Sequence, residues 1–479
     1  MLFSNIRQDA LQKLRGTCFA TLAIVVASIS APAARADTLA DALVSAYANS
    51  GLLVQNRALL RAADEDVAAA GAALEPVVRW TASITQSIGR GQTSPLLGVQ
   101  NSDSLQASGS LIAELLLYDG GATALGIDVA KETVLATRQS LIGVEQQVLL
   151  RGVQAYMGVI EATEFVQLRQ NNVRVLTQEL RAAQNRFEVG EVTRTDVALA
   201  EAQLAEARSG LATAQGNLAI SVEEYRNIIG RSPGRLSPPP QLPRLDGNID
   251  AAKALAVRVH PDLRAVQHRV SAAELAIRRA EAAKRPTVAL QGALSMSDNF
   301  DSSNFSTGAR IGINAGGTIY QGGARSSLAR AAQARRDAER GNLHLVRNNI
   351  QQNVGNAYAQ LSSARASIVA SEQQIRAARI AFNGVREEAT LGARTTLDVL
   401  DAEQALLDAE AARISAQTLV YNAAYAVLAA TGRLTARDLR LPVQFYDVNE
   451  YYNLVKDSPT KRSEQGAQLD RVLKSLQKE

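Results

Sequence analysis

The chain has 479 residues, enough for a large core or several domains, and 46% of them are apolar although only 4% are aromatic. A single cysteine and three histidines exclude a disulfide framework within one chain and argue against a His/Cys metal cage. The formal net charge of +4 falls to +1 without residues 1–36, which carry four positive charges and one negative charge, so the charge gives no support to nucleic-acid binding.

Residues 1–36 have the pattern of a secretory signal peptide. Basic residues precede a short apolar run, Thr17 to Ser30, and Ala34-Arg35-Ala36 is a small-residue cleavage site. Cys18 lies inside this run without a lipid-attachment context, so cleavage would leave a mature chain without cysteine. No later stretch has about 18 continuous apolar residues, and the sequence therefore predicts no transmembrane helix.

The mature chain is expected to begin with a helix and two strands. Asp37 to Ala73 has a helical apolar stripe, which Pro76 ends. Val77 to Ile88 alternates between apolar and polar residues, and Leu105 to Tyr118 is a second extended run. A loop rich in glycine, serine and asparagine, Gly89 to Asp103, separates them. Each run of about 11 to 14 residues is long enough to cross a bilayer as a tilted strand.

A very long helix is predicted next. The pattern from Gly120 to Arg186 contains no proline, and its roughly 66 residues correspond to about 100 Å at 1.5 Å per residue. Apolar residues recur every seven positions, with one four-residue stutter between Val148 and Val159. An ordinary coiled coil fits this pattern as well as a tall helical assembly does. A turn around Gly190 leads to a shorter helix from about Asp196 to Ile229.

The second half of the chain repeats this order. A helix is expected from Ile249 to Lys284, and strands at Thr287 to Met296 and Phe305 to Tyr320. Two short patterns, Y-x-G-G and G-x(5)-D-V, recur at a constant offset of 202 residues, which indicates a duplicated fold. The matched pairs include Tyr118 and Tyr320, Gly190 and Gly392, Thr193 and Thr395, Asp196 and Asp398, and Val197 and Val399.

The repeat sets the predicted domain organisation. Residues 37–230 form the first repeat and residues 249–432 the second, with a Pro-rich linker at 231–248. Residues 433–479 are expected to form an equatorial C-terminal segment, whose charged tail after about Val448 is predicted to be weakly ordered.

Helix lengths and strand number together favour an α+β membrane protein. The two shorter helices of a repeat, placed end to end, match the long helix in length. Four strands per chain cannot close a barrel, and open sheet edges are not tolerated in lipid. A dimer would supply eight strands and little lumen, whereas a trimer would supply twelve strands and a channel.

These features resemble the TolC family of outer-membrane efflux and secretion channels. The duplicated half, the Y-x-G-G return from strand to helix and the paired G-x(5)-D-V turns cover roughly Thr38 to Asp447. The resemblance implies a homotrimer whose strands form one twelve-stranded outer-membrane barrel, continued by a long α-helical periplasmic barrel. It also implies a periplasmic adaptor (membrane fusion) protein, an ABC or RND-type inner-membrane transporter and outer-membrane lipid as partners, in a Gram-negative bacterium.

The function implied is an exit duct for type I protein secretion, multidrug efflux or both. The missing lipid-attachment cysteine fits the secretion and general-export branch of the family. A periplasmic coiled-coil scaffold without a pore is the alternative, although a scaffold needs no membrane-length hairpins. No phosphate-binding loop or catalytic constellation is present, so neither an enzyme nor a cofactor is expected.

The resemblance places a periplasmic entrance gate at the second turn. In the family the D-V-L-D carboxylates, here Asp398 and Asp401, line the closed entrance, and an arginine four residues earlier, here Arg394, helps to hold it shut. Asp196 is the matching residue of the first turn, and Ala389 stands where the family has a tyrosine. Docking of the adaptor is assigned to the turn residues Gly190, Thr195, Gly392 and Thr396.

Helix capping is an alternative role for Asp196 and Asp398, because a threonine precedes each at capping-box spacing. Asp401 has no acidic counterpart, since Leu199 occupies the matched position, and this favours a lumen-facing role. Asp398 and Asp401 share one helical face and are candidates for cation block rather than for a structural metal site.

Two other sets of polar residues are interpreted as structural. Tyr118 and Tyr320 are expected to pack at the barrel rim, where aromatic rings suit a membrane interface. His260, His268 and His344 are dispersed on helical stretches and are interpreted as packed or solvated.

Overall fold

A computed structural model describes residues 36–476, apart from 93–97, 246, 302–303 and 461–462. All of the predicted signal peptide except Ala36 thus lies outside the described residues. The chain folds as two compact units, each of which draws on both repeats. Unit 1 contains Gly152–Leu242, Gln374–Thr418 and the residues up to Ala46, and unit 2 contains Tyr47–Arg151, Pro243–Gln373 and Leu419–Glu479.

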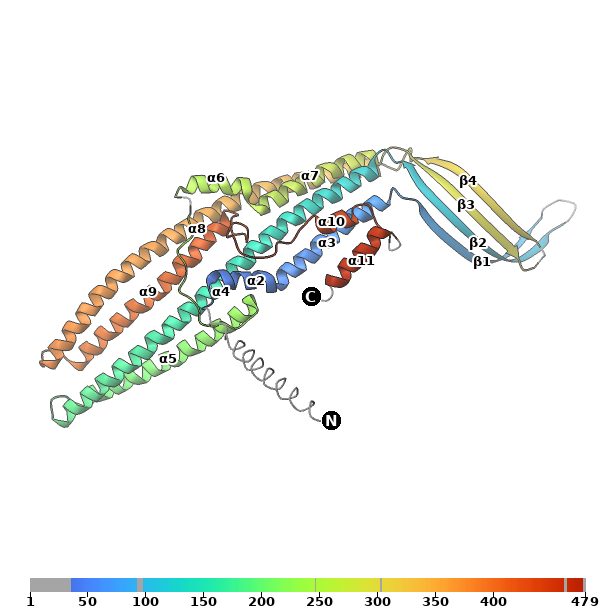
Figure 1. The fold of residues 1–479 in the computed structure, drawn as a ribbon. Coiled ribbons are helices and arrows are strands. Elements are labelled where there is room, and N and C mark those ends of the chain that lie inside the picture. The colour runs from blue at the N-terminus through green and yellow to red at the C-terminus, as the bar shows by residue number, and fades with distance from the viewer. Residues whose placement is uncertain (1–35, 93–97, 246, 302–303, 461–462, 477–479) are drawn as a thin grey trace, which may run out of the picture. The chain divides into compact units, whose positions relative to one another are not determined.

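The same series of elements occurs twice along the chain, which confirms the predicted repeat (Figure 1). Each long helix, α4 and α8, has 67 residues. Among the described residues, no helix has both the length and the apolar character needed to span a membrane.

The first series is α2 (Leu39–Asn49), α3 (Gly51–Ala72), β1 (Val77–Gly91), β2 (Gln100–Tyr118), α4 (Ala122–Glu188) and α5 (Arg194–Ile229). The second is α6 (Ile249–Val259), α7 (Pro261–Ala282), β3 (Thr287–Asn299), β4 (Phe305–Gly316), α8 (Ala324–Thr390) and α9 (Thr396–Ala430). The helices α10 (Glu450–Val455) and α11 (Glu464–Leu476) follow.

The sequence predicts one continuous helix before the strands of each repeat, but the structure has two helices there, α2 and α3 or α6 and α7. The apolar stripe continues through both breaks and therefore did not predict them. Ser50 separates α2 from α3, and its side chain accepts a hydrogen bond from the Leu53 N–H. His260 separates α6 from α7, its Nδ1 accepts from the Asp262 N–H, and Pro261 begins α7. Both breaks have a local cause. Serine favours the N-cap position that Ser50 occupies, and proline favours the first position of a helix, where Pro261 lies.

The four strands form one antiparallel sheet in the order β1-β2-β3-β4 (Figure 1). The sheet belongs to unit 2, and β1 and β4 are its edges. The strands extend further towards the hairpin tips than predicted, whereas β4 ends at Gly316 rather than at Tyr320.

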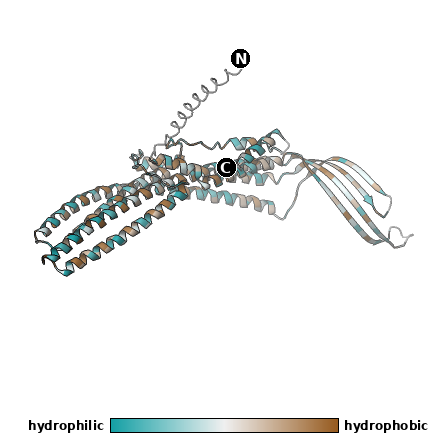
Figure 2. Cartoon of the chain, turned by 60° about the horizontal axis from the view of Figure 1, so that its bottom comes forward, coloured by the Kyte–Doolittle hydropathy of each residue, from teal (hydrophilic) through white to brown (hydrophobic). Residues whose placement is uncertain are grey.

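One face of the sheet is apolar, and its side chains are exposed within the single chain. Figure 2 shows apolar and polar residues alternating along the strands, as the period of two in a strand requires. Trp80 on β1, for example, is 76% exposed. Other exposed residues of the same face are Ile84, Ile88, Leu111, Leu294, Ile311 and Ile313.

Unit 1 packs segments of four helices together. Leu176 of α4, Leu204 of α5 and Leu400 of α9 share one buried cluster. A second cluster joins Phe382 of α8 to Val399 of α9. Burial of each such side chain stabilises the fold by about 1.5–3 kcal/mol, so these clusters fix the helix ends that carry the turns.

The first described residues and the Pro-rich linker meet in unit 1. Asp37 pairs with Leu236 in a single parallel bridge. The buried hydroxyl of Tyr156 lies 3.1 Å from the Asp37 carbonyl oxygen and 2.7 Å from that of Ser237, and it donates there. Burial raises the pKa of Tyr156 to about 12, so the hydroxyl keeps its proton.

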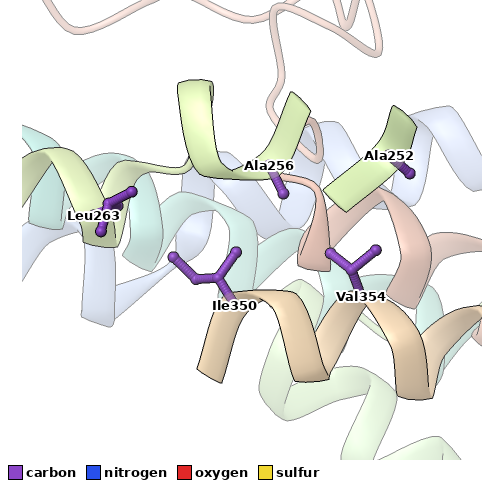
Figure 3. Close-up of a cluster of buried hydrophobic side chains, with 5 residues drawn as sticks. All are labelled: Ala252, Ala256, Leu263, Ile350 and Val354. Atoms are coloured by element: carbon purple, nitrogen blue, oxygen red, sulfur yellow. The ribbon is translucent and has the colours of Figure 1, made fainter. Parts of the chain in front are cut away.

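In unit 2, α6 packs closely on α8 because its contact residues are small. Ala252 and Ala256 face Ile350 and Val354, and Leu263 completes the cluster from α7 (Figure 3). The spacing of four residues places each pair on one helical face.

The C-terminal tail differs from its predicted weak order where it is described. In α10, Tyr451 and Val455 are buried together with Ala68 of α3. The Tyr451 hydroxyl donates to Glu65 Oε1 at 2.6 Å, and the Ser458 hydroxyl donates to the Ala68 carbonyl. The charged composition of the tail predicts weak order, but Tyr451 and Val455 near its start supply the apolar surface that packs on α3.

Candidate functional site

The two turns of unit 1 have the same backbone geometry. Gly190 and Gly392 have φ angles of 81° and 77°, in the left-handed region that favours glycine. The amide of residue 191 donates to the carbonyl of residue 186 at 2.9 Å, and residue 393 repeats the bond to residue 388 at 2.9 Å. This pattern of a left-handed residue with carbonyls capped behind it ends α4 and α8 in the same way.

A capping box begins the helix after each turn. Asp398 Oδ2 accepts from the Thr395 N–H at 2.9 Å and from its hydroxyl at 2.8 Å, and Thr395 Oγ1 accepts from the Asp398 N–H at 3.2 Å. Thr193 and Asp196 form the same arrangement at α5. The hydrogen bonds from the threonines lower the pKa of both carboxyl groups, so both stay ionised. The capping alternative is therefore confirmed for Asp196 and Asp398.

Asp401 lies one turn further along α9 and is exposed. Within the part of the chain that the structure describes, its carboxylate makes no hydrogen bond or ion pair. No local structural contact accounts for this residue, in contrast to Asp398, whose Oδ2 is used in the cap.

Arg394 binds within its own turn rather than across to another helix. Its Nε donates to Glu388 Oε2 at 2.8 Å. Glu388, through this hydrogen bond and its charge, raises the pKa of Arg394, with a smaller contribution from Asp398. The side chain thus ties the turn to the end of α8 and lies close enough to Asp398 for their charges to interact.

Ala389, which replaces the family tyrosine, is buried at 6% exposure beside Phe382 and Val399. Its carbonyl oxygen lies 3.5 Å from Nη1 of Arg186, at the end of α4. The position therefore links the ends of the two long helices through its backbone carbonyl and has no aromatic ring that could help to hold the entrance shut.

A buried polar cluster lies beneath the turns, and the sequence analysis missed it. Glu403 of α9 is only 5% exposed and accepts from the Asn172 side chain of α4 at 3.0 Å. Its Oε2 has no hydrogen-bond partner among the described residues. Close by in the same cluster, Arg386 Nε lies 3.2 Å from Oε1 of the buried Glu179.

Burial raises the pKa of Glu403 to about 7, and the charge of Glu179 adds to this, while Asn172 and Arg386 oppose it. A small cavity of about 90 Å³ adjoins Glu403 and Asn172. The signal that would have found the cluster is an acidic residue, Glu403, between the buried Leu400 and Leu407 on one helical stripe.

The residues predicted to dock a partner differ in exposure. Thr195 is exposed, whereas Thr396 is buried and its hydroxyl has no partner among the described residues. Large apolar side chains occupy matched positions just before the two glycines, with Val189 71% and Leu391 85% exposed. The turns thus present apolar tips that the predicted set did not include.

The two tyrosines predicted at the rim lie in different settings. Tyr118 ends β2 next to an irregularity in the register with β3, and Tyr320 lies beyond the end of β4. Asp119 accepts from the Gly121 and Thr123 N–H groups at 2.9 and 2.6 Å and so caps α4. In the first repeat the Y-x-G-G pattern therefore marks a capped return from strand to helix.

Comparison with known proteins identifies the family of this chain. The model of the family described as outer membrane efflux protein matches residues 42–231 and 254–433, one stretch in each repeat. The chain belongs to the outer membrane efflux protein family. The resemblance predicted from the sequence, the outer-membrane location and the efflux-channel class are confirmed by this membership.

Relatives within the outer membrane efflux protein family cover most of the chain. Outer membrane efflux protein BepC of Brucella suis is 34% identical over 433 residues, which is 90% of this chain and 92% of the relative. Outer membrane protein TolC of Vibrio cholerae is 25% identical and covers 78% of this chain and 86% of its own length. The fold matches the Campylobacter jejuni CmeC outer membrane channel with a TM-score of 0.72, 16% identity and coverage of 88% and 90%.

Proposed function

We propose that three copies of this chain form an exit duct through the outer membrane, used for type I protein secretion, multidrug efflux or both. The duct would work with a periplasmic adaptor protein and with an ABC or RND-type transporter of the inner membrane, which supplies the energy. The observation that carries the proposal is a four-stranded sheet with one apolar face and two free edges, in a chain of the outer membrane efflux protein family.

The sheet argues for closure with other copies. Lipid cannot satisfy the unpaired N–H and C=O groups of the edge strands β1 and β4, so these edges need partners. Three chains supply twelve strands, enough for a lumen, whereas two supply eight and leave little space. A scaffold without a pore would leave the exposed apolar face in water, which disfavours that alternative.

The turns of unit 1 would form the periplasmic end of the duct. Asp398 and Asp401 line the entrance in this proposal, with Arg394 and Asp196 beside them. Both aspartates lie at the start of α9, and Asp401 makes no hydrogen bond or ion pair among the described residues. The adaptor would dock on the turn tips around Gly190, Thr195 and Gly392, supported by the exposed apolar Val189 and Leu391. Tyr118 and Tyr320 would line the inner rim of the barrel.

Purification tests the assembly directly. Extraction of the mature protein should require detergent, and the protein should run as a trimer on SDS gels until it is heated. Reconstituted trimers should conduct ions across planar bilayers. A water-soluble monomer without conductance would overturn the proposal. Deletion of the gene, followed by assays of secreted proteins and of drug sensitivity, separates the secretion branch from the efflux branch.

A further inference from the structure

The register of the sheet places two arginines in one row. Arg79 of β1 is opposite Ile112 of β2, Ile112 is opposite Ala293 of β3, and Ala293 is opposite Arg310 of β4. Residues directly opposite each other in antiparallel strands project from the same face of the sheet. Both guanidinium groups therefore belong to one face, on the two edge strands.

This face is the polar one. Pairs of polar side chains bridge its strands, with oxygen–oxygen distances of 2.6 Å for Thr81 and Ser110 and 2.9 Å for Ser297 and Ser306. Asn314 donates to Gln291 at 2.7 Å on the same face. In a membrane barrel the apolar face meets lipid and the polar face lines the water-filled interior. The arginine row thus lies inside the barrel.

Among the described strand residues, this face carries three charged side chains, Arg79, Glu114 and Arg310. Arg79 Nη2 donates to Glu114 Oε2 at 2.6 Å, which compensates one positive charge. Arg310 has no hydrogen-bond or ion-pair partner within the described residues. Each chain therefore adds a net charge of +1 to the polar face.

Closure by three copies concentrates this charge. The row crosses three interstrand steps of about 4.8 Å, and a strand tilt of about 40° displaces its two ends by about 10 Å along the barrel axis. Because Arg310 and Arg79 lie on opposite edge strands, β4 of one copy brings its Arg310 to the strand that carries Arg79 of the next. Six guanidinium groups and three carboxylates then share a short band of the lumen.

We propose that Arg79 and Arg310 form an anion-binding band inside the barrel, which favours phosphate-, sulfate- or carboxylate-bearing solutes on their way out. This inference rests on the proposed trimeric duct, since the band is incomplete in one chain. The charge is opposite in sign to that of the acidic pair at the turns. A ring of like charges attracts counter-ions into a narrow lumen and so sets selectivity.

Block of the conductance by pyrophosphate tests the band. The anion is titrated on the barrel side of purified trimers in planar bilayers. Arg310→Gln removes three positive charges from the trimer at once. It should raise the half-blocking concentration by about tenfold, which is a larger change than the loss of a single exposed ion pair would cause. Glu114→Gln should lower it, because Arg79 loses its compensating charge. Arg90→Gln is the matched control, because it changes an arginine of β1 on the opposite face.

The outcomes separate this inference from the proposed function. Trimers that conduct, but in which Arg310→Gln and Glu114→Gln leave the half-blocking concentration unchanged, would overturn the band and leave the duct intact. Absence of trimers and of conductance in the unmodified protein would overturn the duct itself. Shifts of opposite sign in the two variants, with Arg90→Gln unchanged, support the band even if one variant assembles less well.

Discussion

At the scale of single residues, capping and gating are compatible roles of Asp398. The capping box uses Oδ2 and leaves Oδ1 without a hydrogen bond among the described residues. The same hydrogen bonds hold the pKa low and so preserve the negative charge. A cap that stays ionised can therefore supply charge to the entrance while it fixes the start of α9.

The acidic pair should bind multivalent cations at the entrance. We expect Asp398→Ala/Asp401→Ala trimers to need a higher concentration of a trivalent cation for half-block from the periplasmic side, because a ring of six carboxylates is lost. Asp438→Ala is the control, since it removes a similar pair of hydrogen bonds with Thr435 outside the two turns and leaves Asp398 and Asp401 unchanged. Equal blocking concentrations in the double variant and the wild type would return the pair to capping alone.

Glu403 should make the stability of the folded chain depend on pH. Its pKa is raised to about 7 from 4.5, so the folded chain holds a proton that the unfolded chain releases. The stabilisation of the folded chain by this bound proton is complete below about pH 4.5 and is lost as the pH rises through about 7. The free energy of unfolding then falls by an amount on the order of 3 kcal/mol per chain. Thermal unfolding should therefore occur at lower temperature at pH 8 than at pH 5.

Glu403→Gln should remove most of this dependence, because the amide keeps the bond with Asn172 and carries no charge to bury. Glu410→Gln is the control on the same helix, where a half-buried carboxylate pairs with Arg379 at 2.7 Å. An unfolding temperature of the Glu403 variant that still falls between pH 5 and pH 8 would show that another group titrates.

At the scale of elements, replacing a glycine by alanine should change the stability in opposite directions in a turn and in a helix. Gly392→Ala places a Cβ on a residue with φ of 77° and should destabilise the chain by about 1 kcal/mol. The effect is one of backbone conformation, because among the described residues no atom beyond the two chain neighbours lies within 4 Å of that Cβ. Gly384→Ala, inside α8 and equally free of neighbours, should stabilise by about 0.5–1 kcal/mol. Unfolding of both variants by heat decides the signs, and equal signs would contradict the backbone argument.

The elements also show what a single sequence predicts well. The duplicated spacing located both long helices, all four strands and the turns, because periodicity and glycine act locally. The breaks at Ser50 and His260 were missed, since an apolar stripe continues through a capped break. In the site, Asp398 was found from its spacing, whereas Glu403 was missed because its partner Asn172 is 231 residues away.

At the scale of the whole molecule, duplication allowed the two turns to differ in charge. Both keep the left-handed glycine and the capping box, which the backbone requires. Asp401 and Arg394 occur only in the second turn, where the first has Leu199 and Val192. The shared features therefore serve the fold, and Arg394 and Asp401 are the charges that set the second turn apart as the candidate entrance.

The chain end should matter to the stability of the molecule. A chain that stops after Val448 loses α10, and with it the burial of Tyr451 and Val455 against α3 and the hydrogen bond to Glu65. Two buried side chains of this size correspond to about 3–6 kcal/mol. The trimer should then dissociate at a lower temperature on SDS gels.

A chain that stops after Thr460 separates this contact from the rest of the tail. It keeps α10 and the bond from Ser458 to Ala68 but lacks α11, whose Leu469 and Leu473 are only partly buried against the same cluster. We expect it to retain most of the heat stability that the shorter chain loses. If both truncated chains match the full-length trimer, α10 contributes nothing to assembly, and the tail behaves as the weakly ordered segment that its composition predicts. Equal losses in the two would instead assign the stabilising contact to α11.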